Sequence, residues 1–196
     1  MTIMTEQGIA GQLPRNKPTV TLRPIRPSDA GLIYEMHRRL SPDSIYYRYL
    51  QRRIPSMAEI EQVCRLDPAK GAGFVATVQR GTEIIVGVAY YVREALARHP
   101  TAEPGILVED QCQGEGIGRN LWRHLQQHAK ANQINWLRVL AHPRNQQMMR
   151  LVQGGGFAYQ AKEDGDLTEY LVALGEHPYP TPLLRGLAEF GFSIFY

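Results

Sequence analysis

The chain has 196 residues, of which 43% are hydrophobic and 21% are charged, and its formal net charge is +3. This is the composition of an ordinary globular protein, and the length predicts one domain with or without tails. The small positive charge does not by itself indicate nucleic-acid binding, although it suits a small anionic ligand. No apolar run approaches the length of a membrane-spanning helix, so we expect neither nucleic acid nor membrane as a partner.

Two cysteines, Cys64 and Cys112, lack the spacing of a metal or redox motif, which favours a reduced, cytoplasmic protein. Residues 1–18 have no long apolar core, so they read as a flexible N-terminal tail rather than a secretory signal. We expect the folded domain over 19–175. The segment 176–196, rich in proline and aromatic residues, is expected to be a C-terminal extension that either packs on its own domain or forms a homodimer contact.

The first part of the domain predicts a strand followed by helices. A strand is expected over 20–25, and 28–40 reads as a helix capped by Ser28. One face of this helix is apolar and is expected to be buried through Leu32, Ile33, Met36 and Leu40. Two short helices follow over 41–50 and 56–66.

The remaining elements predict a mixed sheet. Strands over 73–79 and 83–92 join around Gly81, a third strand covers 103–108, and a buried strand covers 134–141. The helix after 116 has a buried stripe of Ile117, Leu121, Leu125 and Ala129. A helix over 144–153, with Met148, Leu151 and Val152 inward, stops at three glycines, and a strand pair turns around Asp164-Gly165. The order predicts an α/β fold of the mixed α+β kind, with a mostly antiparallel sheet flanked by helices.

The stretch "QCQGEGIGRN" (111–120) places Gly114, Gly116 and Gly118 between a strand and a helix. The N-terminus of a helix has unpaired N–H groups and a positive dipole end, and glycines let a bulky anion approach them. The stretch is therefore either a phosphate site or simply a tight turn. A P-loop is excluded because Arg119-Asn120 follow the last glycine, and the dinucleotide fingerprint is excluded by the glycine spacing.

The pattern from Gln113 to Gly118 resembles the Gln/Arg-x-x-Gly-x-Gly/Ala loop of the GNAT superfamily of N-acetyltransferases, which bind acetyl-coenzyme A. "NQQMMRLVQGGGF" (145–157) resembles the second motif of the family, and the order of elements also matches. The stretches over 22–50 and 101–118 look most like the acetyltransferase domain of bacterial protein lysine acetyltransferases.

The resemblance implies a GNAT fold whose strands splay apart at a cleft for acetyl-coenzyme A, the co-substrate. Main-chain amides of the glycine loop, with Arg119, would hold the pyrophosphate, and the strand ending at Val108 would offer its main chain to the pantetheine arm. Arg144 and Arg150 are either phosphate partners or solvated surface. Acidic Glu115 departs from the base that many relatives carry there. The candidate cofactor-binding residues are Leu107, Val108, Gln113, Gly114, Glu115, Gly116, Ile117, Gly118, Arg119, Asn145 and Met148.

Acetyl transfer requires a neutral amine, whereas a lysine-like amine is almost fully protonated at neutral pH. The resemblance implies Glu103 as the general base, acting directly or through water; the alternative is a solvated carboxylate between Pro100 and Pro104. Val152 stands where many relatives carry a tyrosine acid, so water, Tyr90 or Tyr91 remain open as the acid. A backbone N–H of 106–108 would hold the oxyanion.

Other residues could take part, but each also has a simpler interpretation. His124 and His128 lie four apart on one helix without a third ligand, so no metal site is expected. Tyr46, Tyr47 and Arg48 either form a substrate rim or pack. The first hypothesis is an N-acetyltransferase in which a protein lysine attacks directly in a ternary complex. The alternatives are a small-amine acetyltransferase and a non-catalytic acetyl-coenzyme A sensor.

Overall fold

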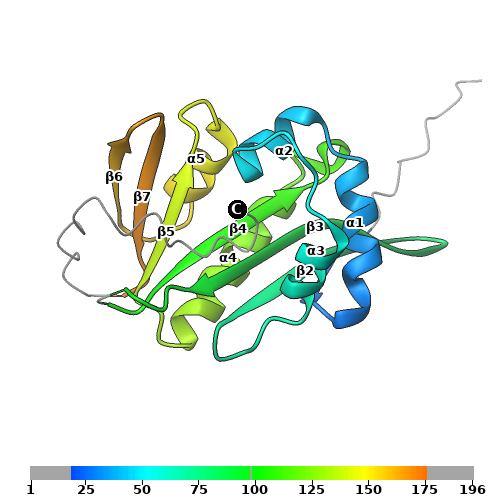
Figure 1. Ribbon diagram of the computed structural model, residues 1–196, viewed down its shortest axis with the longest axis horizontal. Coiled ribbons are helices and arrows are strands. Elements are labelled where there is room, and N and C mark those ends of the chain that lie inside the picture. The colour runs from blue at the N-terminus through cyan, green and yellow to red at the C-terminus, as the bar shows by residue number, and fades with distance from the viewer. Residues whose placement is uncertain (1–18, 98, 176–196) are drawn as a thin grey trace, which may run out of the picture.

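Seven strands form one sheet in the order β1-β2-β3-β4-β5-β7-β6 in the computed structural model, which describes residues 19–97 and 99–175. The expected mixed, mostly antiparallel sheet flanked by helices is confirmed, and the predicted order of elements is correct (Figure 1). Both terminal segments, 1–18 and 176–196, lie outside the described residues, and so do the predictions made for them. The strands are β1 Thr21–Pro24, β2 Gly71–Arg80, β3 Thr82–Arg93, β4 Thr101–Val108, β5 Trp136–Ala141, β6 Tyr159–Asp164 and β7 Leu167–Ala173.

Five α-helices and two short 3-10 helices connect these strands in the described part of the chain. No helix there is long and apolar enough to cross a membrane. The helices are α1 Ala30–Arg38, α2 Pro42–Tyr49, α3 Met57–Cys64, α4 Ile117–Ala131 and α5 Gln146–Gln153, and the 3-10 helices are η1 Pro27–Asp29 and η2 Asp110–Cys112.

The sheet opens between β4 and β5. These strands are parallel and pair only at Thr101↔Trp136 and Ala102↔Leu137, whereas β4 stays paired with β3 from Ala102 to Val108. Figure 1 shows β4 and β5 running apart from this shared end, β4 toward α2 and β5 toward α5. Beyond Ala102, the edge of β4 therefore faces a gap in the hydrogen-bonded sheet. The splay that the resemblance implied is present.

The two faces of the sheet are covered by different helices. The buried stripe of α4, which includes Leu121 and Leu125, packs with Ala76, Leu137 and Val139 in the largest core cluster. All four residues of the predicted stripe are buried. Because side chains alternate along a strand, the residues between those core positions point to the opposite face. There α1, α2 and α3 pack over β2, β3 and β4 in two smaller clusters.

Two predictions for the first helix were wrong. Leu32 was expected in the buried face, but 37% of its surface is exposed, while Ile33 and Met36 are buried. Helical positions one apart differ by about 100°, so Leu32 lies at the edge of the stripe that Ile33 centres. Ser28 was expected to cap the helix, but Ser28 belongs to η1 and the N-cap position is Asp29.

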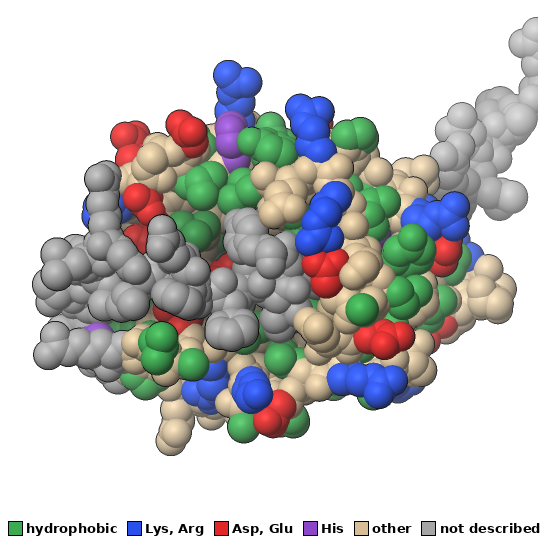
Figure 2. Space-filling view, in the orientation of Figure 1, with side chains coloured by type: hydrophobic (Ala, Val, Ile, Leu, Met, Phe, Trp, Pro, Cys, Tyr) green, Lys and Arg blue, Asp and Glu red, His purple; other side chains and the backbone are tan. Residues whose placement is uncertain are grey.

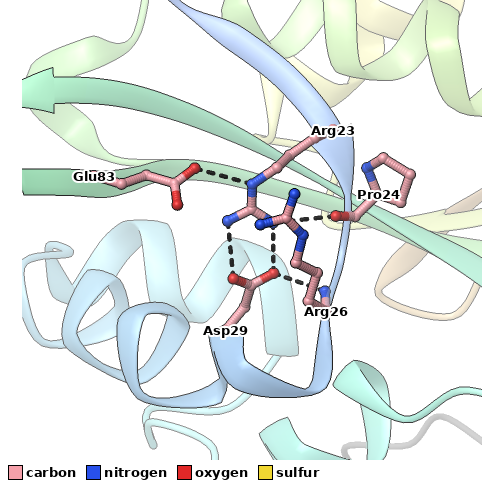
Figure 3. Close-up of polar contacts among 5 residues, drawn as sticks. All are labelled: Arg23, Pro24, Arg26, Asp29 and Glu83. Atoms are coloured by element: carbon pink, nitrogen blue, oxygen red, sulfur yellow. Dashed lines mark hydrogen bonds and ion pairs between the residues drawn. The ribbon is translucent and has the colours of Figure 1, made fainter.

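The Asp29 side chain is used for a different purpose. It accepts hydrogen bonds from Arg23 at 2.7 and 2.9 Å, and Arg23 also donates to Glu83 at 2.9 Å, which ties η1 to β1 and β3 (Figure 3). The main-chain N–H of Arg26 donates to the same carboxylate at 2.7 Å. Burial alone raises the pKa of Asp29, but these donors outweigh it and hold the pKa below its ordinary value.

Candidate active site

The loop between β4 and α4 presents main-chain donors around two left-handed glycines. Gly114 has φ +76° and Gly116, the N-cap of α4, has φ +86°, a conformation that costs other residues roughly 1–2 kcal/mol. A Cβ at either position would meet nothing within 4 Å, so the space beside the loop is open. Ile117 is buried and starts the helix, whereas Glu115 and Arg119 are exposed. An open loop at the positive end of a 15-residue helix fits a diphosphate.

Gln113 links this loop to its neighbours through its side chain. Its amide nitrogen donates to the carbonyl oxygen of Val108 at 3.0 Å and to Ser44 Oγ at 3.3 Å, and its amide oxygen accepts from Gln147 of α5 at 2.7 Å. Its main-chain N–H donates to the carbonyl of Asp110 at 3.2 Å. The Gln113 N–H is therefore already used, so donors for a diphosphate would have to come from the residues after it. Sequence analysis did not identify Gln147, which looks like any other polar residue on a helix.

The edge of β4 has a defined set of main-chain groups facing the splay. The N–H of Glu109 donates to the carbonyl of Val86 on β3 at 2.8 Å, and antiparallel hydrogen bonding alternates along a strand. The main chain of Leu107 therefore points to β3, and its side chain packs between α1 and the sheet. The N–H groups of Ile106 and Val108 point the other way, toward the gap. Ile106 and Val108, rather than Leu107, are therefore the residues of β4 whose main-chain N–H groups face the space for a pantetheine arm.

Glu103 lies at the point where the two strands part. It follows Ala102, the last residue of β4 that pairs with β5, and it is half-buried rather than fully solvated. Burial raises the pKa of Glu103, Arg48 and Arg138 lower it, Glu94 raises it, and the net shift is upward. A carboxylate with a raised pKa in this position is suited to accept a proton from an amine.

Two tyrosines of β3, Tyr90 and Tyr91, were candidates for the general acid, and in the structure they lie on opposite faces of the sheet. Tyr90 is the cross-strand partner of Gly105 and packs in the cluster under α2, on the same face as Glu103. Tyr91 points to the opposite face, where its hydroxyl lies 3.1 Å from Nδ1 of His128. Burial raises the pKa of Tyr90 to about 12, so its hydroxyl remains a proton donor at neutral pH. Only Tyr90 of the pair shares the face of the candidate base.

Arg48 of α2 lies against Tyr90 and β4. Its guanidinium donates to the Tyr90 hydroxyl, and its Cζ is 5.2 Å from the centroid of that ring. A side chain at Gly105 would overlap the guanidinium, so Arg48 occupies the surface of β4 one position along the same face from Glu103. Arg138 of β5, which sequence analysis missed, is hydrogen bonded to Glu94 at 2.6 Å.

The end of β4 also anchors the helices that carry these residues. Glu109 accepts two hydrogen bonds of 3.0 Å from Arg39, the C-cap of α1. Asp110 accepts from Ser41, the N-cap of α2, through its N–H at 2.9 Å and its hydroxyl at 2.7 Å, and from Ser44 Oγ at 2.8 Å. One short segment thus sets the glycine loop, α1 and α2 in a fixed arrangement.

The second motif forms the start of α5. Asn145 is the N-cap, and its Oδ1 accepts from the N–H of Met148 at 3.0 Å. Met148 and Val152 are buried in the core. Contact of Asn145 and Met148 with the cofactor stays a prediction. Arg144 and Arg150 are exposed, as is Arg119.

The other four candidates from the sequence, two tyrosines and two histidines, pack against aromatic or imidazole rings. The rings of Tyr46 and Tyr47 lie 5.7 and 5.9 Å from the ring of His142, which follows β5, so they pack between α2 and the β5–α5 loop. His124 and His128 lie edge-on to Phe74. Among residues 19–97 and 99–175, no group of three or more His, Cys, Asp or Glu side chains could hold a metal ion. On the face in Figure 2, acidic and basic side chains are interspersed over the described surface.

An open glycine loop before a helix and a split between two parallel strands have the arrangement that the resemblance implied for a coenzyme A site, and a half-buried carboxylate lies at the start of the split. The chain belongs to the GNAT acetyltransferase family, because residues 19–158 match the family model described as "Acetyltransferase (GNAT) domain". The family membership confirms the resemblance and, with it, acetyl-coenzyme A as the co-substrate.

Solved structures of different specificity share the fold. The GNAT domain of S. lividans PAT is 20% identical with a TM-score of 0.68, over 82% of this chain and 98% of that one. Ribosomal-protein-alanine N-acetyltransferase from Brucella melitensis is 18% identical with a TM-score of 0.61, over 78% and 97%. Spermidine N-acetyltransferase from Vibrio cholerae, with coenzyme A and spermine, is 17% identical with a TM-score of 0.61, over 79% and 95%.

Proposed function

We propose that this protein transfers the acetyl group of acetyl-coenzyme A to a primary amine, with Glu103 as the general base. The observation that supports this most directly is the position of Glu103, half-buried at the first residue of β4 beyond the pairing with β5. The main-chain donors of the glycine loop lie at the far end of the same strand. A thioester held along β4 by those donors would place its carbonyl within the gap that Glu103 borders.

The proposed reaction is a direct attack within a ternary complex. Glu103 removes a proton from the ammonium group of the acceptor, directly or through water, and the neutral amine attacks the thioester carbonyl. The N–H groups of Ile106 and Val108, which point into the gap, are positioned to stabilise the oxyanion. The Tyr90 hydroxyl is the candidate proton donor to the departing thiolate. The amide bond forms as the carbon–sulfur bond breaks, and the nitrogen gives its second proton to the tyrosinate left by Tyr90. Coenzyme A leaves as the thiol, and Glu103 passes its proton to solvent.

We propose that the acceptor is a protein lysine, because of the charges that surround Glu103. A lysine carries one cation on an apolar stem, and one carboxylate beside the tyrosine and arginine cluster suits that charge. A polyamine would need further carboxylates. Glu94, the carboxylate that acts on Glu103, is already paired with Arg138 at 2.6 Å, and the same arginine lies 3.9 Å from Glu169. A small amine with a single charge is the second candidate acceptor.

The test of the reaction is release of the coenzyme A thiol with a panel of acceptors. Lysine peptides, spermidine and free amino acids would each be supplied with acetyl-coenzyme A, and binding of the thioester would be measured by calorimetry. Turnover with lysine peptides alone supports the proposed acceptor, and turnover with the small amines alone overturns it. Binding without release from any acceptor would identify a sensor domain instead of an enzyme.

The first prediction concerns the base. Glu103→Gln removes the proton acceptor but keeps the shape of the side chain, so kcat should fall roughly 100- to 10,000-fold. The affinity for acetyl-coenzyme A, measured by calorimetry, should be nearly unchanged. Glu35→Gln, which alters an exposed carboxylate of α1, serves as the control and should have normal turnover. Normal turnover in Glu103→Gln at controlled pH would remove Glu103 from the mechanism.

A further inference from the structure

The charged and titratable groups around Glu103 come from several elements. Arg48 approaches from α2, Tyr90 from β3, Glu94 from the segment after β3, and Arg138 from β5. Arg138 is shared, because it donates to Glu94 at 2.6 Å and lies 3.9 Å from Glu169 of β7. Its charge therefore serves three carboxylates. Arg48 has different surroundings, which consist mainly of aromatic rings.

Two tyrosines and the backbone of β4 surround the guanidinium of Arg48. Its Cζ lies 4.9 Å from the ring centroid of Tyr49 and 5.2 Å from that of Tyr90, and it donates to the Tyr90 hydroxyl. The guanidinium also lies against the backbone of Gly105, where any Cβ would overlap the guanidinium. Glu103 is two residues earlier on β4, so both side chains lie on the same face of the strand about 7 Å apart along it.

The helix that carries Arg48 is fixed independently of the charge cluster. Asp110 accepts three hydrogen bonds from Ser41 and Ser44 at the first turn of α2. Ile45 of α2 is buried and packs in a cluster with Tyr49, Val63 and Tyr90. A guanidinium on this helix cannot lose its proton at any pH that the fold tolerates, so its charge is constant. Arg48 thus has the features of a permanent cation held beside Glu103.

We propose that Arg48 is a positioning residue for the acetyl transfer: by its charge beside Glu103 and its hydrogen bond to Tyr90, it holds the base ionised and the tyrosine hydroxyl oriented at the point where β4 and β5 part. The inference rests on the proposed function for the role of Glu103. Burial and Glu94 favour the protonated form of Glu103, whereas Arg48 and Arg138 oppose them. Without Arg48, a larger fraction of the base would already carry a proton and could not accept one.

The direct test is a titration that needs no acceptor. Carboxyl ¹³C NMR of the full chain follows the glutamate side chains with pH, and the signal missing from Glu103→Gln identifies Glu103. Arg48→Gln should raise the pKa of Glu103, since a cation that favours the ionised carboxylate is removed. Arg48→Lys keeps the charge and should shift the pKa less. Arg53→Gln makes the same charge change at an exposed arginine paired with Glu59, and should leave Glu103 unaltered.

The second measurement is the pH profile of kcat/KM with an acceptor from the panel. In Arg48→Gln the acidic limb should move to higher pH by the shift seen in the NMR titration. A merely structural role for Arg48 would lower the rate equally at every pH and lower the melting temperature. If Arg48→Gln does not fold, then Tyr90→Phe, which removes the hydrogen bond, and Arg48→Lys decide the question by the same titration.

The outcomes separate this inference from the proposed function. If Glu103→Gln abolishes turnover but Glu103 titrates at the same pH in Arg48→Gln and in the wild type, only the inference for Arg48 is overturned. If Glu103→Gln turns over normally, the base assignment fails and the role of Arg48 in the reaction fails with it. The NMR titration then still decides whether Arg48 controls the charge of Glu103.

Discussion

Gly105 has no side chain at the point of β4 where the guanidinium of Arg48 lies. In Gly105→Ala the new methyl group would overlap that guanidinium and crowd the ring of Tyr90. Arg48 would have to move, and the cost of such overpacking is typically about 1–3 kcal/mol. We therefore expect a lower free energy of unfolding in urea, together with a raised pKa of Glu103 like that in Arg48→Gln.

Gly31 provides the matched control for this substitution. It lies in α1, and a Cβ there would meet nothing within 4 Å. Gly31→Ala should therefore stabilise the protein by up to about 1 kcal/mol, because alanine is the better helix former. Normal stability and an unshifted pKa of Glu103 in Gly105→Ala would show that Arg48 can leave β4 without consequence.

The local residues of the site were predictable, and the distant ones were not. Gly114 and Gly116 were identifiable because a left-handed turn before a helix needs glycine within a few residues. Arg48 reaches β4 across 57 positions of the chain, and nothing in its neighbours along α2 indicates that Gly105 leaves room for it. Arg138 was missed for the same reason: its environment is created by the register of β5 with its neighbours.

At the scale of elements, one carboxylate holds the N-terminus of α2 in place. Asp110→Ala would remove the acceptor of three hydrogen bonds at the N-terminus of α2. We expect a loss of about 1–3 kcal/mol in the free energy of unfolding, because the Ser41 and Ser44 donors are left partly buried without this partner. Faster hydrogen exchange should be confined to the amides of α2. The effect should appear above the unfolded pKa of an aspartate and vanish at lower pH, since the folded pKa of Asp110 is lowered.

Asp43→Asn tests whether charge alone explains this effect. Asp43 is also acidic and lies in the first turn of the same helix, but it is exposed. Its substitution should alter stability by less than about 0.5 kcal/mol, which is usual for a surface change. An equal loss in both variants would mean that the helix dipole, and not the hydrogen bonds of Asp110, stabilises α2.

The order of elements could be predicted because each has a local period. The apolar runs of β2 and β3 and the stripe of α4 are visible within ten to fifteen residues, and the two strands and the helix were predicted correctly. The cap of α1 was misplaced because residues 27–29 form the 3-10 helix η1 ahead of the α-helix, and the position of η1 is fixed by the bonds of Asp29 to Arg23 on another element. The length of the β4–β5 pairing is also a property of the assembled sheet. The splay was therefore expected from the resemblance and not from the residues of either strand.

At the scale of the whole molecule, proteins about 20% identical share the fold over nearly their full length. Such a fold depends on the pattern of apolar positions more than on their identity, since cores tolerate many substitutions that keep volume and pattern. The acceptor is a different matter: these neighbours include enzymes named for a ribosomal protein and for spermidine, so the shared fold does not fix the acceptor. This is why the family follows from the sequence with little ambiguity while the acceptor requires experiment.

Global stability is tied to pH by a buried histidine between α1 and α2. His37 is 2% exposed, its Nδ1 lies 2.7 Å from the carbonyl oxygen of Ile33, and its Nε2 lies 2.5 Å from the Tyr49 hydroxyl. Burial lowers the pKa of His37 to about 4; the bond to Ile33 partly opposes this, and Arg48 adds to the lowering. The folded protein therefore keeps His37 neutral at pH values where the unfolded chain takes up a proton at this residue.

The sign of the pH dependence follows from this difference. Below an unfolded pKa of about 6.5 the unfolded state binds one more proton than the folded state. The free energy of unfolding therefore decreases as the pH is lowered from 6.5 to about 4, by about 3 kcal/mol in total. His37→Gln should be less stable at pH 7, because it disturbs the bond to Tyr49, but its free energy of unfolding should change less between pH 6.5 and 5. Urea unfolding of both proteins at several pH values measures the two slopes. Equal slopes would mean that His37 becomes protonated inside the folded protein, and that the contact between α1 and α2 accommodates the charge.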